Sequence, residues 1–119
     1  QYAAQWAVEH FETADAMREI YDARRKVMVA GLNSIPGIRC AMPAGAFYAF
    51  ADVRAFGMDT AVLCERILEE ARVVCTPGSC FGDSGEGFIR FSYANSVENI
   101  EEAIRRLRTF AARLPHVEF

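Results

Sequence analysis

The feature that most constrains the fold is residues 73–95, where two apolar β-type segments flank a loop rich in glycine. Residues 73–76 form a β-branched run that we expect to be a strand. Pro77 and Gly78 should end it, because proline cannot extend a ladder and glycine lets the backbone turn. A second strand is expected over residues 88–93. The stretch therefore predicts two strands joined by a loop, with the rest of the chain arranged around them.

Arg90 is the anomaly of the second strand. Alternation along a strand puts Phe88, Arg90 and Ser92 on one face and leaves the more apolar residues on the other. A buried guanidinium without a partner is costly, so three interpretations stay open: an edge-strand arginine, a partner for an internal carboxylate, or a receptor for an anionic ligand. The neighbouring glycine loop favours the third, because it lets a ligand approach the backbone closely.

The remaining periodicities predict four helical and two further strand segments. Residues 38–42 and 46–53 should form strands of one hairpin. Helices are expected over residues 2–11, from Thr13 or Asp15 to residues 31–33, from Asp59 or Thr60 to residue 71, and from Ser96 to residue 114. The order predicts an α+β fold: a two-layer small domain whose mostly antiparallel or mixed sheet of about four strands is covered by helices.

The second predicted helix has an apolar stripe and a charged face. The stripe consists of Met17, Ile20, Tyr21, Val27 and Met28. The charged face consists of Arg18, Arg24, Arg25 and Lys26, and we expect it to be solvated.

Composition excludes several classes of function. The 119 residues are 52% hydrophobic and 24% charged, and the net charge of -3 gives no reason to expect nucleic-acid binding. The first twenty residues have neither the basic region of a signal peptide nor an uninterrupted apolar segment, so we expect no membrane segment and a cytoplasmic protein. Cys40, Cys64, Cys75 and Cys80 lack metal-ligand spacing, so we expect free thiols and no metal.

One short motif is similar to a catalytic loop but does not predict that chemistry. The run Gly82-Asp83-Ser84-Gly85 is similar to the nucleophile loop of trypsin-like serine proteases. That fold is all-β and needs a partner histidine, whereas His10 and His116 lie in helical or terminal segments of a helix-rich chain. The glycine loop also precedes a strand instead of opening a helix, so it does not predict a nucleotide phosphate cradle.

Three motifs, taken in order, carry a resemblance to a known family. They are PAGAFYAF at residues 43–50, VVCTPGSCFG at residues 73–82 and EGFIRFS at residues 86–92. Together they resemble the C-terminal part of class I/II aminotransferases, the pyridoxal-phosphate enzymes of the aspartate aminotransferase fold. The resemblance implies that residues 1–119 are the C-terminal small domain, with residues 1–33 as the helical connection from a large domain that is missing here.

The resemblance also implies roles for particular residues. Arg90 matches the arginine that binds the substrate α-carboxylate, and a planar guanidinium suits a carboxylate at two points. The active-site loop would comprise Pro77, Gly78, Ser79, Phe81 and Gly82. Pyridoxal 5'-phosphate would be held by a Schiff-base lysine of the large domain. The sole lysine here, Lys26, lacks the motif around that lysine, so no catalytic or cofactor-binding residue is expected in this segment.

The function implied is transfer of an amino group from an amino acid to a 2-oxo acid by a full-length homodimer, with the isolated domain inactive. Same-fold lyases, decarboxylases and synthases share the pattern, so they remain alternatives. A binding module without catalysis is the alternative from another class.

Overall fold

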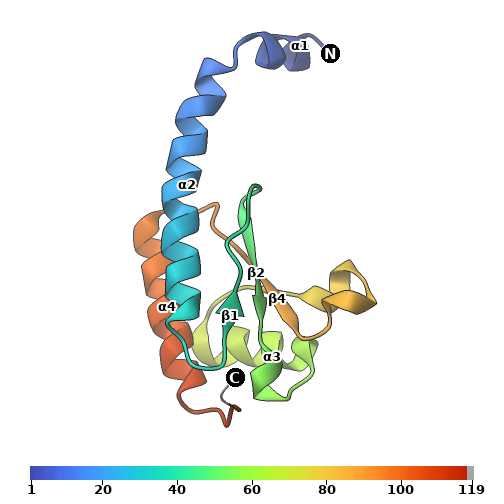
Figure 1. Ribbon diagram of the computed structural model, residues 1–119, viewed down its shortest axis with the longest axis vertical. Coiled ribbons are helices and arrows are strands. Elements are labelled where there is room, and N and C mark those ends of the chain that lie inside the picture. The colour runs from blue at the N-terminus through green and yellow to red at the C-terminus, as the bar shows by residue number, and fades with distance from the viewer. Residues whose placement is uncertain (118–119) are drawn as a thin grey trace.

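The computed structural model describes residues 1–117 and has two layers, helices on a sheet (Figure 1). The α-helices are α1 (Tyr2–Glu9), α2 (Glu12–Asn33), α3 (Thr60–Arg66) and α4 (Val97–Ala111). The strands are β1 (Arg39–Cys40), β2 (Tyr48–Asp52), β3 (Thr76–Pro77) and β4 (Phe88–Ser92). A π-helical turn, Ile67–Ala71, continues α3, and short 3-10 helices occupy Arg54–Phe56, Gly78–Phe81 and Asp83–Gly85. The predicted α+β small domain with a four-stranded sheet is confirmed.

The sheet has the strand order β1-β2-β4-β3, and every neighbouring pair is antiparallel. β1 and β2 form the predicted hairpin. β4 lies between β2 and β3, with Arg90 directly opposite Phe50 on one side and Thr76 on the other. Arg90 is therefore on an interior strand, which removes the edge-strand interpretation.

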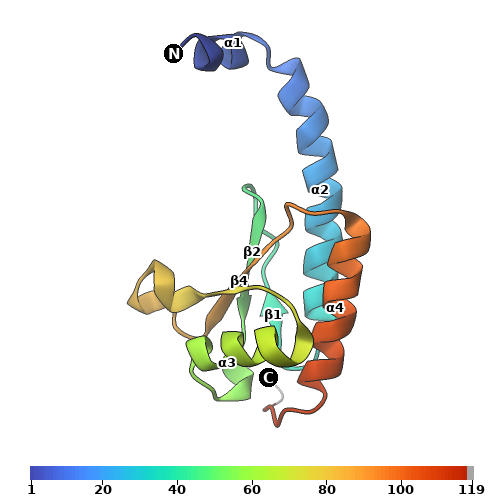
Figure 2. The same cartoon turned by 180° about the vertical axis from the view of Figure 1, so that it is seen from behind.

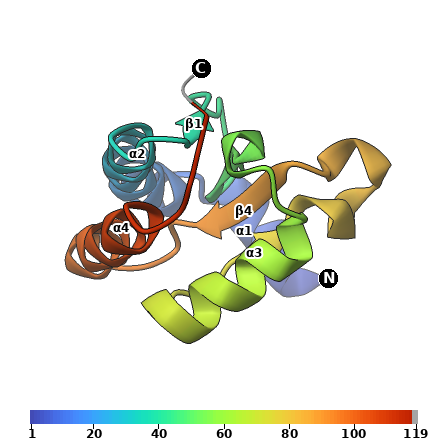
Figure 3. The same ribbon diagram turned by 90° about the horizontal axis from the view of Figure 1, so that it is seen from below.

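One face of the sheet is covered by α2, α3 and α4, and the core lies between these layers (Figures 2 and 3). The sheet contributes alternate residues to this core: Ala49, Ala51, Ile89 and Phe91 are at most 3% exposed. From α4, Ile100, Ile104 and Leu107 are also buried. The period-two pattern of β4 and the helical pattern of α4 thus meet in one continuous core, as both patterns predict.

The strand predicted at residues 73–76 is wrong in its extent. β3 is only Thr76–Pro77, so proline pairs within the sheet instead of ending it. This is possible because β3 is an edge strand, where the missing N–H of proline can face away from the ladder. Residues 73–75 approach the sheet without joining the ladder, and Val74 is 82% exposed.

Helix α2 begins earlier than predicted and projects beyond the sheet (Figure 1). Its N-cap position is Phe11, with no side-chain cap, and not Thr13 or Asp15. Only its last part reaches the core, so Met17 and Ile20, at the start of the predicted apolar stripe, are about half exposed. The projecting half carries α1 at its end, which explains the long dimension of 51 Å against 30 and 26 Å.

The predicted starts of the last two helices are confirmed. The Asp59 side chain accepts hydrogen bonds from the backbone N–H groups of Ala61 and Val62 at the start of α3. The Ser96 hydroxyl accepts one from Asn99 at the start of α4. Over the described residues, no helix combines the length and the apolar character that crossing a bilayer would require.

Candidate functional site

The face of the sheet turned away from the helices carries the candidate site, and we call it the open face. It is defined by the side chains of Tyr48, Phe50, Phe88, Arg90 and Ser92. Directly opposed residues of antiparallel strands point to the same side, so the register places Tyr48 beside Ser92 and Phe50 beside Arg90. The open face is thus an aromatic surface with one guanidinium near its centre.

The Arg90 guanidinium lies between two aromatic rings. Its central carbon is 4.5 Å from the centroid of the Phe81 ring and 5.2 Å from that of Tyr48. Rings against a guanidinium hold it by cation–π attraction and leave its N–H edge for a planar acceptor. Within residues 1–117 Arg90 makes no ion pair, so an internal carboxylate in this part of the chain does not explain it.

The acidic side chain of β2 that lies nearest to Arg90 in the strand register already has an ionic partner. Asp52 accepts hydrogen bonds from the Arg54 backbone N–H and from the Arg54 guanidinium, at 3.0 Å and 2.5 Å. The hydrogen bond from the Arg54 side chain is the main reason that the pKa of Asp52 lies below its usual value. Arg54 in turn lies over the Phe88 ring. Asp52 and Arg54 thus satisfy each other, and no ion pair joins Asp52 to Arg90 in the described part of the chain.

The loop between β3 and β4 folds back tightly on itself before it reaches Arg90. A Cβ atom on Gly78 would collide with the backbone oxygens of Gly85 and Phe88, so the two ends of the loop approach each other as only glycine allows. Gly82 has a φ of 118°, which also favours glycine. This close contact makes the loop a compact structure that brings Phe81 onto the guanidinium.

The predicted loop residues divide into two groups. Phe81 contacts Arg90, Gly78 lies next to the Phe50 ring, and Pro77 pairs with Ile89 on β4. Ser79 and Gly82 are exposed, and the structure shows them bonded to each other within the loop, from the Gly82 N–H to the Ser79 carbonyl at 3.2 Å. The structure therefore brings Phe81 and Gly78 to the site and leaves Ser79 and Gly82 at the outer side of the loop.

Glu86 is a structural element of the site that sequence reasoning missed. Its carboxylate accepts hydrogen bonds from the Thr60 backbone N–H at 3.0 Å and from the Thr60 hydroxyl at 2.8 Å. Thr60 is fully buried at the start of α3, so these two bonds anchor the end of the loop to that helix. The two residues are 26 positions apart, and no local pattern joins them.

Arg25 also departs from its prediction. Instead of being solvated, it is partly buried and donates hydrogen bonds to the Pro43 carbonyl and to Asp22, each at 2.5 Å. It thereby ties α2 to the turn before β2. The neighbouring groove between α2 and this turn has a volume of about 600 Å³ and is lined partly by Tyr21, Phe47 and Tyr93.

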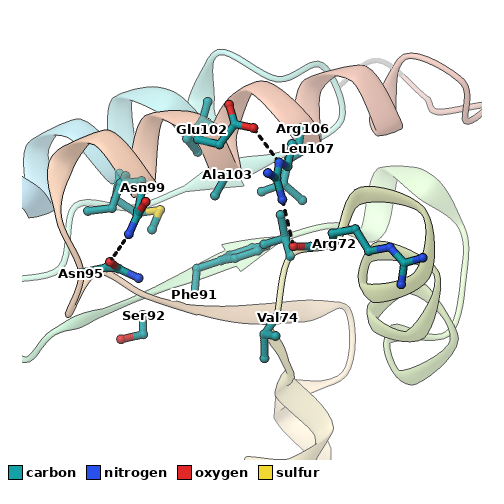
Figure 4. Close-up of a pocket in the computed structure, with 14 residues that line it drawn as sticks. Arg72, Val74, Phe91, Ser92, Asn95, Asn99, Glu102, Ala103, Arg106 and Leu107 are labelled. Carbon is teal, nitrogen blue, oxygen red and sulfur yellow. Dashed lines mark hydrogen bonds and ion pairs between the residues drawn. The ribbon is translucent and has the colours of Figure 1, made fainter.

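A second groove, about 340 Å³, lies between α4 and the segment that leads into β3 (Figure 4). Four of its polar side chains form two bonded pairs. Asn99 donates to Asn95 at 2.8 Å, Arg106 pairs with Glu102 at 2.7 Å, and Arg106 also reaches the Arg72 carbonyl at 3.5 Å. The groove does not include Arg90. We therefore place the candidate site at the open face, where the Arg90 guanidinium has no ionic partner among the residues that the structure describes.

Two further observations limit the chemistry of this chain. Lys26, its only lysine, is exposed on α2 and pairs with Asp22 at 2.6 Å, far in sequence from the open face. Among residues 1–117, no cluster of three or more histidine, cysteine or acidic side chains could hold a metal ion. The site that remains among residues 1–117 is an aromatic surface around the Arg90 guanidinium.

Comparison with known proteins supports the resemblance. The family model for aminotransferases of class I and II matches residues 1–107. The chain is 41% identical over 111 residues to a putative aminotransferase, YugH, of Bacillus subtilis, covering 92% of this chain and 28% of the relative. It is 42% identical over 99 residues to an aspartate aminotransferase of Pyrococcus horikoshii, covering 83% of this chain and 25% of that protein.

Solved structures agree with the sequence comparison. An aromatic aminotransferase of Pyrococcus horikoshii superposes with a TM-score of 0.83 at 39% identity, over 87% of this chain and 28% of that one. The aspartate aminotransferase of Rhizobium meliloti superposes with a TM-score of 0.73 at 38% identity, over 81% of this chain and 26% of that one. The chain thus spans little more than a quarter of the length of the proteins it matches.

Proposed function

Because the chain belongs to the class I and II aminotransferase family, we propose that it is the small domain of a pyridoxal-phosphate-dependent aminotransferase and that Arg90 binds the α-carboxylate of the substrate. The whole protein would transfer an amino group from an amino acid to a 2-oxo acid. The observation that carries the proposal is the half-buried Arg90 guanidinium, flanked by Phe81 and Tyr48 and without an ion pair in residues 1–117.

The cofactor does not fit the residues of this chain, since its only lysine is on α2 and paired with Asp22. We propose that pyridoxal phosphate binds to the part of the protein outside residues 1–119, where it supplies an electron sink. Residues 1–33 would connect to that part, since the projecting half of α2 exposes apolar side chains that a further domain could cover.

The part played by this chain is to hold and orient the substrate. A guanidinium fixed between two rings can donate two parallel hydrogen bonds to a carboxylate, which fixes both the position and the plane of the bound amino acid. The compact loop, anchored through Glu86 to Thr60, keeps Phe81 in place and would form one wall of the cleft. Pre-organisation of this kind lowers the entropy cost of orienting the substrate.

The proposal extends to partners and location. We propose a homodimeric, cytoplasmic enzyme whose substrates are an amino acid and a 2-oxo acid. A lyase, decarboxylase or synthase of the same fold would use Arg90 in the same way. Profiling amino donors and products with the longer protein separates these reactions, because only transamination forms a new amino acid from a 2-oxo acid.

The experiment uses Arg90→Lys and Arg90→Ala in the longer protein, with the cofactor bound. Lysine keeps the charge but loses the two-point geometry, so it should weaken amino acid and 2-oxo acid substrates together and leave cofactor absorbance unchanged. Arg90→Ala should cost about 2 to 5 kcal/mol in kcat/KM, as for one partner of a buried charge pair.

Arg54→Lys is the matched control, because this arginine also lies over an aromatic ring of the sheet but is paired with Asp52. It should leave kcat/KM close to that of the parent enzyme. The chain of residues 1–119 alone should form no product above a cofactor-only blank. If Arg90→Ala lowers the melting temperature and leaves kcat/KM of the folded enzyme unchanged, the assignment is wrong.

A further inference from the structure

A third groove lies between α4 and the π-helical turn that continues α3, and its volume is about 330 Å³. Both elements belong to the helical layer, on the other side of the sheet from Arg90. Four of the side chains that line this groove are arginines, namely Arg72, Arg105, Arg106 and Arg113. We call it the arginine groove.

Three of these arginines share one face of α4. Side chains seven or eight residues apart on a helix lie on the same side, so Arg105 and Arg106 lie on the face that carries Arg113. Arg72 lines the groove from the opposite wall, at the end of the π-helical turn. Its backbone carbonyl accepts a hydrogen bond from the Arg106 guanidinium at 3.5 Å, which joins the two walls (Figure 4).

Two of the four arginines share a single carboxylate. Arg105 and Arg106 both pair with Glu102, at 2.6 Å and 2.7 Å. The lining of the groove in the described chain includes one acidic residue, Glu70. Its charge is compensated by Arg66, with which it pairs at 2.8 Å. Glu70 therefore does not balance the arginines of the groove.

The other two arginines, Arg72 and Arg113, are exposed and make no ion pair among the residues that the structure describes. One carboxylate thus serves four guanidinium groups, so the local potential is positive although the whole chain has a net charge of -3. An anion that binds this chain should therefore be attracted by the groove and not by the overall charge.

The backbone of Arg72 gives a second, independent observation. This residue has the left-handed conformation, with a φ of 57° and a ψ of 39°. At the end of a helix this conformation favours glycine, because the Cβ of any other residue approaches the neighbouring carbonyl oxygen. An arginine is therefore held here against the preference of the backbone. Strain of this kind is concentrated at functional sites, which points to a use for the unpaired guanidinium.

We propose that the arginine groove binds a chain of linked phosphate groups. A guanidinium is planar and always charged, and it can donate two parallel hydrogen bonds to phosphate oxygens. Seven residues separate Arg106 from Arg113, which is about 10 Å along the helix axis, so the groove favours an extended anion over a single phosphate. This inference goes beyond the proposed function and does not rest on it.

The test is isothermal titration calorimetry of residues 1–119 with inorganic triphosphate at low ionic strength. We expect one site, whose affinity falls as salt is added, because exposed charges are screened. Inorganic phosphate should bind at least about tenfold more weakly, since it meets fewer guanidinium groups. ATP should bind within about twofold of triphosphate, because the described lining offers no aromatic ring on which a base could stack.

Arg72→Gly is the most informative variant, because the backbone favours glycine at this position. It should weaken triphosphate binding about fivefold or more, and the melting temperature should not fall. Arg113→Gln should weaken binding to a similar extent. Arg18→Gln is the matched control, since it removes one positive charge from the projecting half of α2, where Arg18 pairs with Asp15 at 3.5 Å. It should change the affinity by less than about twofold.

Four results would overturn the proposal. Triphosphate could fail to bind at low ionic strength, or citrate, which carries carboxylates in place of phosphates, could bind as tightly. Arg18→Gln could weaken binding as much as Arg72→Gly and Arg113→Gln do, which would make the net charge responsible. A lower melting temperature for Arg72→Gly would show that the fold itself uses this arginine, and the strain would then have a structural cause.

Discussion

The two faces of β4 are formed by alternate residues of one strand, and they differ in their chemistry. Toward the helices, Ile89 and Phe91 are buried in the apolar core. On the open face, Phe88 and Arg90 are only half-buried, and their neighbours are aromatic rings: the Phe88 ring stacks on Phe50, and the Arg90 guanidinium lies over Phe81. The comparison shows that one strand can pack the core with one set of alternate residues and hold a guanidinium among aromatic rings with the other.

The largest loss of stability should come from a substitution on the face of β4 that packs against the helices, which we call the covered face. Phe91→Ala should lower the free energy of unfolding of residues 1–119 by about 3 to 5 kcal/mol, because it opens a cavity beneath α4. Phe88→Ala is the control from the open face. It loses mainly the stacking on Phe50, whose ring lies 5.2 Å away between centroids, and should cost only about 1 kcal/mol. Urea unfolding of both variants measures the contrast, and equal losses would show that the faces are not distinct.

A smaller loss of stability is expected from removing the Tyr93 hydroxyl, a polar group on the covered face. The Tyr93 hydroxyl donates to the Ala46 carbonyl at 3.0 Å, and burial is the main cause that raises the pKa of Tyr93 above its usual value. Tyr93→Phe should cost about 1 kcal/mol near neutral pH, the worth of one buried hydrogen bond.

This contribution should depend on pH in one direction. A raised pKa means that the folded chain favours the protonated phenol, so its stabilisation is complete below the unfolded-state pKa of about 10 and is lost as the pH rises through the folded value. The difference between the parent chain and Tyr93→Phe should therefore shrink above about pH 10. Urea unfolding at several pH values measures it, and a constant difference would contradict this account.

Much of this contrast could be predicted from sequence. The alternation of residues 88–93 correctly divides β4 into two faces, and the helical period of α4 identifies its buried stripe. Both patterns are local, with periods of two and 3.6 residues, so they can be recognised in the sequence without knowledge of the tertiary structure. The hairpin of β1 and β2 was predictable from the short gap between the two strand segments.

The surroundings of Arg90 could not be predicted in this way. Phe81 reaches the guanidinium from a loop whose path depends on the contact between Gly78 and Gly85. The Glu86 anchor on Thr60 joins residues far apart in sequence. The sequence predicts that Pro77 ends the strand, because sequence alone does not tell an edge strand from a central one. Each of these depends on strand order or loop path, which is set by the whole fold.

The most direct test of the division between the faces is the stability of Arg90→Ala in residues 1–119. If Arg90 is held for a ligand, it has no internal ion pair to lose, and urea unfolding should show a loss of about 1 kcal/mol or less, the size of an exposed cation–π contact. A loss of about 3 to 5 kcal/mol, the cost of breaking a buried ion pair, would contradict the account and make Arg90 a structural residue.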